Sequence, residues 1–181
     1  MRALIDTCIV IDALQNREPF AENAQQIFLA VANKRVMGFL TAKSAADIYY
    51  ITHRHTHKDR DARKVLSTLF SLFELLDTAG MDCRRAISSE LTDYEDAMML
   101  ETALRCGMDC IVTRNLRDYE RSPVQVYTPS AFLTLIEEET GDERPVPQPA
   151  GSNFKDCQIV FAQSGSPLMF TRSDLHGISV L

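Results

Sequence analysis

Short apolar runs alternate along the chain with longer segments that place apolar residues at helical spacing. The short runs predict four strands, at residues 2–6, 36–40, 110–113 and 124–127. The longer segments predict helices at residues 7–14, 18–33, 41–51, 63–75, 84–90, 93–106 and 128–136. Strands separated by helices form a parallel sheet with both faces covered, so the predicted fold class is α/β.

The amino-acid composition changes after residue 139. Residues 140–153 contain three Pro and two Gly but few apolar residues, which is typical of a linker. Beyond it, residues 157–162 and 167–171 are two short apolar runs that form a candidate β-hairpin. We therefore expect a domain at 1–139, a Pro/Gly-rich linker at 140–153 and a C-terminal tail at 154–181.

Composition places the chain among ordinary globular proteins. Of its 181 residues, 45% are hydrophobic and 24% are charged, and the net charge is −6. An acidic protein attracts nucleic acid only through a local basic patch. No apolar run is long enough to span a membrane, and Asp6 interrupts the stretch that a signal peptide would need, so we expect a cytoplasmic protein with no membrane contact. Five cysteines without periodic spacing predict free, mostly buried thiols.

Acidic side chains gather near the predicted carboxyl ends of strands, where parallel sheets carry their chemistry. Asp6 ends the first strand, Asn115 and Asp118 follow the third, Asp47 lies early in the helix after the second, and Asp96 begins the helix that leads into the third. Four carboxylates about 6 Å apart repel by roughly 3 kcal/mol per pair at an effective dielectric constant of 20.

Such a cluster needs protons or a cation to balance its charge. Because the set offers oxygen ligands, it favours Mg²⁺ or Mn²⁺ over zinc. Metal-assisted attack of water on a phosphodiester is the reaction that such a site supports best. The alternative is that individual acids such as Asp93 and Asp96 are ordinary helix caps.

Three segments resemble the PIN-domain ribonucleases, the family that includes the VapC-like toxins of toxin–antitoxin pairs. They are residues 4–14 (LIDTCIVIDAL), 93–97 (DYEDA) and 111–119 (IVTRNLRDY), and the resemblance covers roughly residues 1–137. It implies a PIN-like three-layer α/β/α domain with a short, mainly parallel sheet, and a Mg²⁺- or Mn²⁺-dependent endoribonuclease site.

Carried over by position, the resemblance implies that Asp6, Asp96 and Asp118 hold the metal. Asp47 stands where many members have Glu, and we expect Asp47 and Asn115 to orient the attacking water. These five residues are the predicted catalytic set.

Two positions raise an alternative function. Cys8 stands where the family often has Asn, and Asn115 where many members have Asp. The alternative is a catalytically impaired PIN-like module that binds RNA or a protein. A phosphotransferase or nucleotide binder is disfavoured, since no second acid stands at Cys8 and no Gly-rich loop follows the first strand.

Four residues are predicted to contact substrate: Thr113, Arg114, Arg54 and Lys58. Arg54 and Lys58 belong to residues 53–64, which carry a net charge of +3 and form either an RNA-contacting patch or a solvated helix connection. Arg114 adjoins the acidic centre, where it would contact the scissile phosphate or pair with Asp118 or Glu95. The expected partners are RNA, a cognate antitoxin protein implied by the resemblance, and a second copy in a homodimer.

Overall fold

A five-stranded parallel sheet forms the centre of the protein. The computed structural model describes residues 1–141. The strands are β1 (Arg2–Ile5), β2 (Met37–Thr41), β3 (Glu74–Leu76), β4 (Cys110–Val112) and β5 (Gln125–Tyr127). They lie in the order β3-β2-β1-β4-β5, and every neighbouring pair is parallel. The prediction of a parallel α/β sheet is therefore confirmed.

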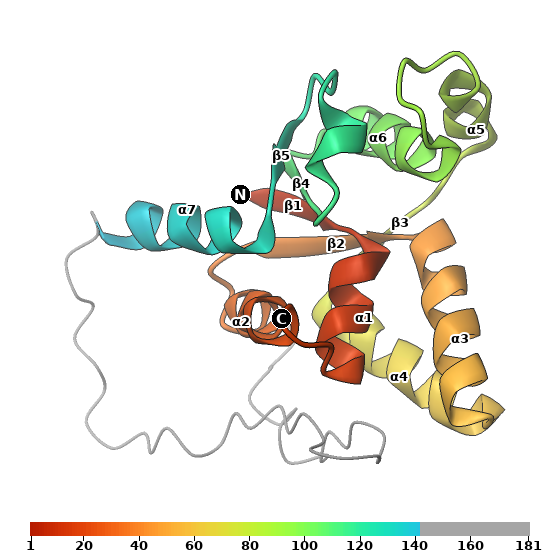
Figure 1. Ribbon diagram of the computed structural model, residues 1–181, viewed down its shortest axis with the longest axis vertical. Helices are drawn as coiled ribbons and strands as arrows, with labels where there is room; N and C mark the ends of the chain where they lie inside the picture. The colour runs from red at the N-terminus through yellow and green to blue at the C-terminus, as the bar shows by residue number, and fades with distance from the viewer. Residues whose placement is uncertain (142–181) are drawn as a thin grey trace, which may run out of the picture.

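Helices cover both faces of this sheet. They are α1 (Thr7–Gln15), α2 (Ala21–Ala32), α3 (Ala42–Thr56), α4 (Asp59–Leu72), α5 (Gly80–Ala86), α6 (Tyr94–Cys106) and α7 (Pro129–Gly141), with a 3-10 turn, η1, at Leu116–Tyr119. Figure 1 shows α5 and α6 on one side of the sheet and α1 to α4 on the other. The arrangement confirms the predicted three-layer α/β/α fold.

The two faces of β1 contribute to two separate hydrophobic cores. Ala3 and Ile5 pack with α1, α2 and α7 on one face, while Leu4 packs with α6 on the other. All three side chains are fully buried. Alternating residues of a strand point to opposite faces, so a strand covered on both sides is apolar on both, as β1 is from Ala3 to Ile5.

The strand order creates a switch point between β1 and β4. From β1 the chain moves outward through β2 to β3, and it then returns to the other side of β1 to form β4 and β5. In open parallel sheets, ligands bind beyond the carboxyl ends of the strands at such a point. Asp6 directly follows β1, and Thr113 directly follows β4. The topology thus places these two residues at the expected binding position.

Several predicted elements were wrong in their extent. The helix predicted at 41–51 continues to Thr56, and the helix predicted at 63–75 begins at Asp59 and ends at Leu72. Residues 74 and 75, predicted as the end of a helix, belong to strand β3, a short edge strand whose Glu74 and Leu75 are exposed. The apolar residues of α4 run without a break into this strand, so periodicity alone does not separate them. The helix predicted at 84–90 is α5, which begins at Gly80, because the Asp82 carboxylate accepts a hydrogen bond from the Ala79 N–H at its start.

The described residues end inside the predicted linker. Helix α7 continues through Gly141, the second residue of the predicted linker; the rest of that linker and the tail with its candidate hairpin lie outside the described residues.

Cys8, Cys83, Cys106 and Cys110 are free, but Cys110 alone among these four is fully buried. Within residues 1–141, no helix has the length and apolar character that crossing a bilayer demands.

Candidate active site

Asp6 joins the end of β1 to the start of α1. Its backbone is extended, and its carboxylate caps the helix by accepting a hydrogen bond from the Cys8 N–H at 3.3 Å. A carboxylate at a helix N-terminus satisfies backbone donors and complements the positive end of the helix dipole. The strand-to-helix turn therefore fixes one acidic side chain at the sheet edge.

Two further side chains hold the Asp6 carboxylate. The Thr113 hydroxyl, at the end of β4, donates to Asp6 Oδ2 at 2.7 Å, and the Cys8 thiol donates to the same oxygen at 3.0 Å. The Thr113 oxygen in turn accepts from the Asn115 N–H at 3.1 Å. Cys8 thus supplies a donor at the position where the family often has Asn, and Thr113, which was predicted to contact substrate, donates to Asp6.

Asp96 enters the site from the other face of the sheet. Asp93 caps α6 by accepting from the Glu95 and Asp96 N–H groups at 2.7 and 3.1 Å, so Asp96 lies in the first helical turn. Its Oδ1 accepts a hydrogen bond from the Tyr119 hydroxyl at 3.1 Å. Asp93 is therefore the cap of α6, one of the two acids for which the sequence left that role open. The Asp96 carboxylate does not cap the helix and lines the pocket.

The environment of Asp96 disfavours its charge. Burial raises the pKa of this carboxyl to about 7, and the charges of Asp6, Asp93 and Asp118 act in the same direction, although the hydrogen bond from Tyr119 opposes the shift. Carboxylates close enough to repel one another favour a bound cation, which would balance their charge.

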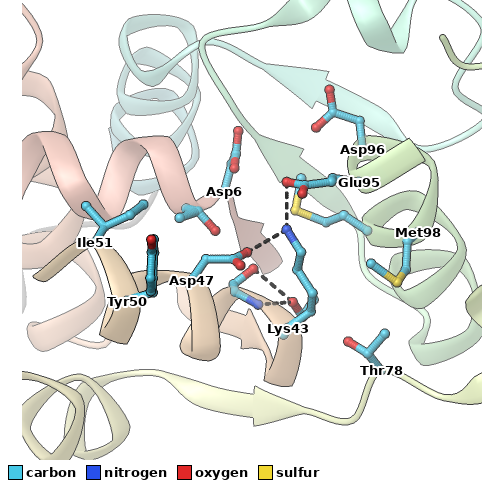
Figure 2. A pocket seen from close by; sticks show the side chains of 13 residues that line it. Asp6, Lys43, Asp47, Tyr50, Ile51, Thr78, Glu95, Asp96 and Met98 are labelled. Atoms are coloured by element: carbon cyan, nitrogen blue, oxygen red, sulfur yellow. Dashed lines mark hydrogen bonds and ion pairs between the residues drawn. The ribbon is translucent and has the colours of Figure 1, made fainter. Parts of the chain in front are cut away.

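A pocket lies between Asp6, the start of α3 and the start of α6. Asp6, Asp47, Glu95 and Asp96 all line it. Lys43 Nζ lies 2.5 Å from Asp47 Oδ2 and 2.7 Å from Glu95 Oε2, and so joins the two helices across the pocket. Figure 2 shows the Lys43 amine between these two carboxylates, with Asp6 and Asp96 beyond them.

Asp118 and Asn115 lie close to one another at the edge of this site. The Asn115 amide hydrogen-bonds to Asp118 Oδ2, and the Thr92 hydroxyl donates to Asp118 Oδ1 at 3.4 Å. The charge of Asp118 reaches Asp96, but neither Asn115 nor Asp118 lines the pocket. The structure thus brings Asp6, Asp47 and Asp96 together and leaves the other two beside them.

Arg114 does not line the acidic pocket. Its Nε lies 3.0 Å from Oδ2 of the fully buried Asp12 of α1, and its guanidinium stacks over the Phe20 ring at 4.2 Å. The sequence analysis left three partners open for Arg114: Asp118, Glu95 and a substrate phosphate. The acid that it contacts in the structure is Asp12. Arg114 therefore ties the loop after β4 to the first helix.

Arg54 and Lys58 also lie outside the pocket. Arg54 is in the last turn of α3, about 18 Å along the axis from Ala42 at the rise of an α-helix. Lys58 precedes α4, and its side chain is 74% exposed. The basic segment is thus at the opposite end of α3 from the acids.

The donor chemistry fits a hard divalent cation bound through few protein ligands. Among the described side chains, no three of His, Cys, Asp or Glu are placed to ligate one ion. Mg²⁺ usually binds through one or two carboxylates, with waters and substrate phosphates completing its shell. Asp6 and Asp96, which repel one another and line one pocket, meet that requirement.

The Cys8 thiol is expected to resist alkylation. Burial and the Asp6 charge raise the pKa of Cys8 to about 11, and burial raises the pKa of Cys110 to about 12. At pH 8 about one Cys8 in a thousand would be thiolate, against roughly a quarter of an unperturbed thiol. Mass spectrometry after iodoacetamide treatment should find Cys8 unmodified in the native protein and modified in urea. Fast native modification would show that the thiol does not donate to Asp6.

Sequence reasoning missed three participants in this site. Glu95 and Lys43 line the pocket, and Tyr119 donates to Asp96. The spacing of Lys43 and Asp47 is a recognisable i, i+4 ion pair, so that contact had a sequence signal. The contacts to Glu95 and Tyr119 depend on packing between elements, for which the sequence carries no such signal.

Several solved structures share this fold. A chain of the toxin–antitoxin complex from Klebsiella pneumoniae has 24% identity and a TM-score of 0.53, and the match covers 70% of this chain and 97% of that one. A chain of VapBC2 from Rickettsia felis, bound to a promoter DNA fragment, has 15% identity and a TM-score of 0.54, with 71% and 98% covered. FitAcB from Neisseria gonorrhoeae has 15% identity and a TM-score of 0.53, also with 71% and 98% covered.

At these identities the structural likeness establishes the fold alone. No curated protein matches the chain significantly. The sequence profile described as the PIN domain matches residues 2–117, which include β1, Asp6, Asp96 and Thr113. Since this match covers more than half of the chain and agrees with the observed fold, the protein belongs to the PIN domain family.

Proposed function

We propose that the protein is a divalent-metal-dependent endoribonuclease that hydrolyses RNA phosphodiester bonds and acts as the toxin of a toxin–antitoxin pair. The observation that carries this proposal is the meeting of Asp6 and Asp96 in one pocket at the switch point of the sheet. Membership of the PIN domain family and the fold likeness to a chain of a toxin–antitoxin complex support it.

Asp6 and Asp96 would hold the ion, Mg²⁺ or Mn²⁺, with Asp118 as a third acid beside them. A bound divalent ion lowers the pKa of water and balances the charge that develops on the phosphate. Thr113 and Cys8 fix the Asp6 carboxylate, and Tyr119 fixes that of Asp96. The protein residues thus hold two carboxylates in a set orientation before substrate arrives.

The other predicted residues receive separate roles in this proposal. Asp47 lines the pocket beside Asp6 and would orient the attacking water, whereas Asn115 holds Asp118. Arg54 and Lys58 would contact phosphates some distance along the RNA from the cleaved bond. A cognate antitoxin and a second copy of the chain are the proposed protein partners.

The test is cleavage of an unstructured RNA by the purified protein with Mg²⁺ or Mn²⁺. We expect cleavage that EDTA abolishes, that Asp6→Asn lowers by at least about 100-fold, and that Glu74→Gln, at an exposed position of β3 outside the pocket, leaves intact. Equal cleavage by the wild type and Asp6→Asn would overturn the proposal. RNA binding without metal binding would support the catalytically impaired module instead.

Replacing Thr113 by Val tests how the site is held together. The change keeps the shape of the side chain but removes the hydroxyl that donates to Asp6 and accepts from the Asn115 N–H. Loss of a group that orients a metal ligand typically costs 10–100-fold in metal affinity. Calorimetric titration with Mn²⁺ should show a loss in this range, while Thr113→Ser retains most of the affinity. Unchanged affinity in Thr113→Val would contradict the positioning role.

A further inference from the structure

Lys43 carries the positive charge inside an acidic pocket. Within the described residues, it is the sole basic side chain among those that line the pocket, against four acids: Asp6, Asp47, Glu95 and Asp96. Its side chain is 27% exposed, so much of it is shielded from solvent. The proposed nuclease role in the preceding section gives this lysine no task.

The Lys43 ammonium is committed to two carboxylates. Its Nζ lies 2.5 Å from Asp47 Oδ2 on its own helix and 2.7 Å from Glu95 Oε2 on α6. In Figure 2 the side chain reaches across the pocket toward Glu95, with Asp47 beside it. An ammonium held between two acids is better suited to balance their charge than to receive a substrate phosphate.

The same two carboxylates would be the ligands of a second metal ion. Two-metal hydrolytic sites hold their ions about 4 Å apart and need carboxylates on both sides. An ion bound by Asp47 and Glu95 would meet the Lys43 ammonium within bonding distance of both ligands, where like charges repel. Lysine and a second cation therefore exclude one another on this side of the pocket.

We propose that Lys43 is a built-in counter-ion that takes the place of a second metal ion, so that the site holds one divalent cation, on its Asp6 and Asp96 side. The inference rests on the proposed function, because it presupposes a metal at those two residues. It adds to that function the number of metal ions, one per chain. It also assigns to Lys43 the positive charge that balances Asp47 and Glu95.

Calorimetric titration with Mn²⁺ alone, without RNA, tests the proposal on the full chain. We expect one ion per wild-type chain and two per chain in Lys43→Met, which removes the charge but keeps most of the length. Lys43→Gln is a second neutral variant with the same expectation. Lys43→Arg should keep one ion, as should Lys34→Met, which removes the same charge at an exposed position outside the pocket.

The outcomes separate this inference from the proposed function. Two ions in the wild type, or one ion in folded Lys43→Met and Lys43→Gln, would overturn the counter-ion role and leave the nuclease proposal standing. No binding by the wild type would overturn both. Circular dichroism of each variant confirms that it is folded before its stoichiometry is compared.

Discussion

Replacing Asp96 by Asn is expected to abolish metal binding while stabilising the metal-free protein. The ionised carboxylate is unfavourable in its pocket, since burial and the charges of Asp6, Asp93 and Asp118 raise its pKa to about 7. A folded-state pKa above the unfolded value of about 3.9 means that ionised Asp96 lowers stability as the pH rises from about 4 to 7. Asn removes this cost and still accepts the Tyr119 hydrogen bond.

The two effects are measured separately. Urea unfolding without metal should show Asp96→Asn at least about 1 kcal/mol more stable than the wild type at pH 8, and little difference at pH 4, after allowance for solvent screening. Mn²⁺ affinity should fall by at least about 100-fold. Glu74→Gln, a loss of one negative charge at an exposed position of β3 outside the pocket, should change neither. A destabilised Asp96→Asn at pH 8 would contradict the repulsion described here.

Replacing Asp82 by Ala is expected to destabilise the fold strongly. The Asp82 side chain is fully buried and accepts from both Nε and an Nη of Arg105 at 2.8 Å, from the Thr102 hydroxyl at 3.1 Å and from the Ala79 N–H at 2.8 Å. Truncation removes the acceptor of Arg105 Nε and of the Ala79 N–H, while the Thr102 hydroxyl keeps the Met98 carbonyl and the Arg105 Nη keeps the Asp77 carbonyl. It also breaks the side-chain link between α5 and α6. The expected loss is about 3 kcal/mol in the free energy of unfolding.

Urea unfolding at several pH values checks this prediction. The hydrogen bonds from Arg105 hold the pKa of Asp82 below its usual range, so its contribution is present above pH about 4 and declines as the pH falls further. The difference between the wild type and Asp82→Ala should shrink accordingly. Glu90→Ala, which removes an exposed ion pair with Arg121, is the control and should have little effect. A similar loss in both variants would contradict the assigned role of burial.

The layers of the fold follow from residue patterns that the sequence displays. The strand β1 is apolar on both faces, and Gly107 ends α6 in a left-handed conformation, as its place after the helix predicts. Strand β3 escaped prediction because a three-residue edge strand with two exposed residues has no alternation to detect. The start of α5 escaped prediction because its N-cap, Ala79, has no capping side chain, and the Asp82 carboxylate accepts from the Ala79 N–H instead.

The candidate site was predictable where topology alone decides its position. Asp6 and Asp96 follow from strand ends and helix starts, and the pocket brings them together with Asp47. The partner of Arg114 was not predictable. Asp12 is a single acid in the largely apolar helix α1, and nothing in the sequence indicates that the loop after β4 packs against it. Lys43 was overlooked because a surface ion pair within α3 gives no sign that it crosses to Glu95.

The central claim is that Asp6 and Asp96 form a metal-dependent nuclease site. Titration of Mn²⁺ and Mg²⁺ into the wild type and Asp6→Asn, with cleavage of unstructured RNA measured at the same metal concentrations, tests it most directly. Binding that Asp6→Asn abolishes, with cleavage that rises in proportion to metal occupancy, is the predicted result. Failure of the wild type to bind either ion at millimolar concentration, or cleavage independent of occupancy, would contradict the claim.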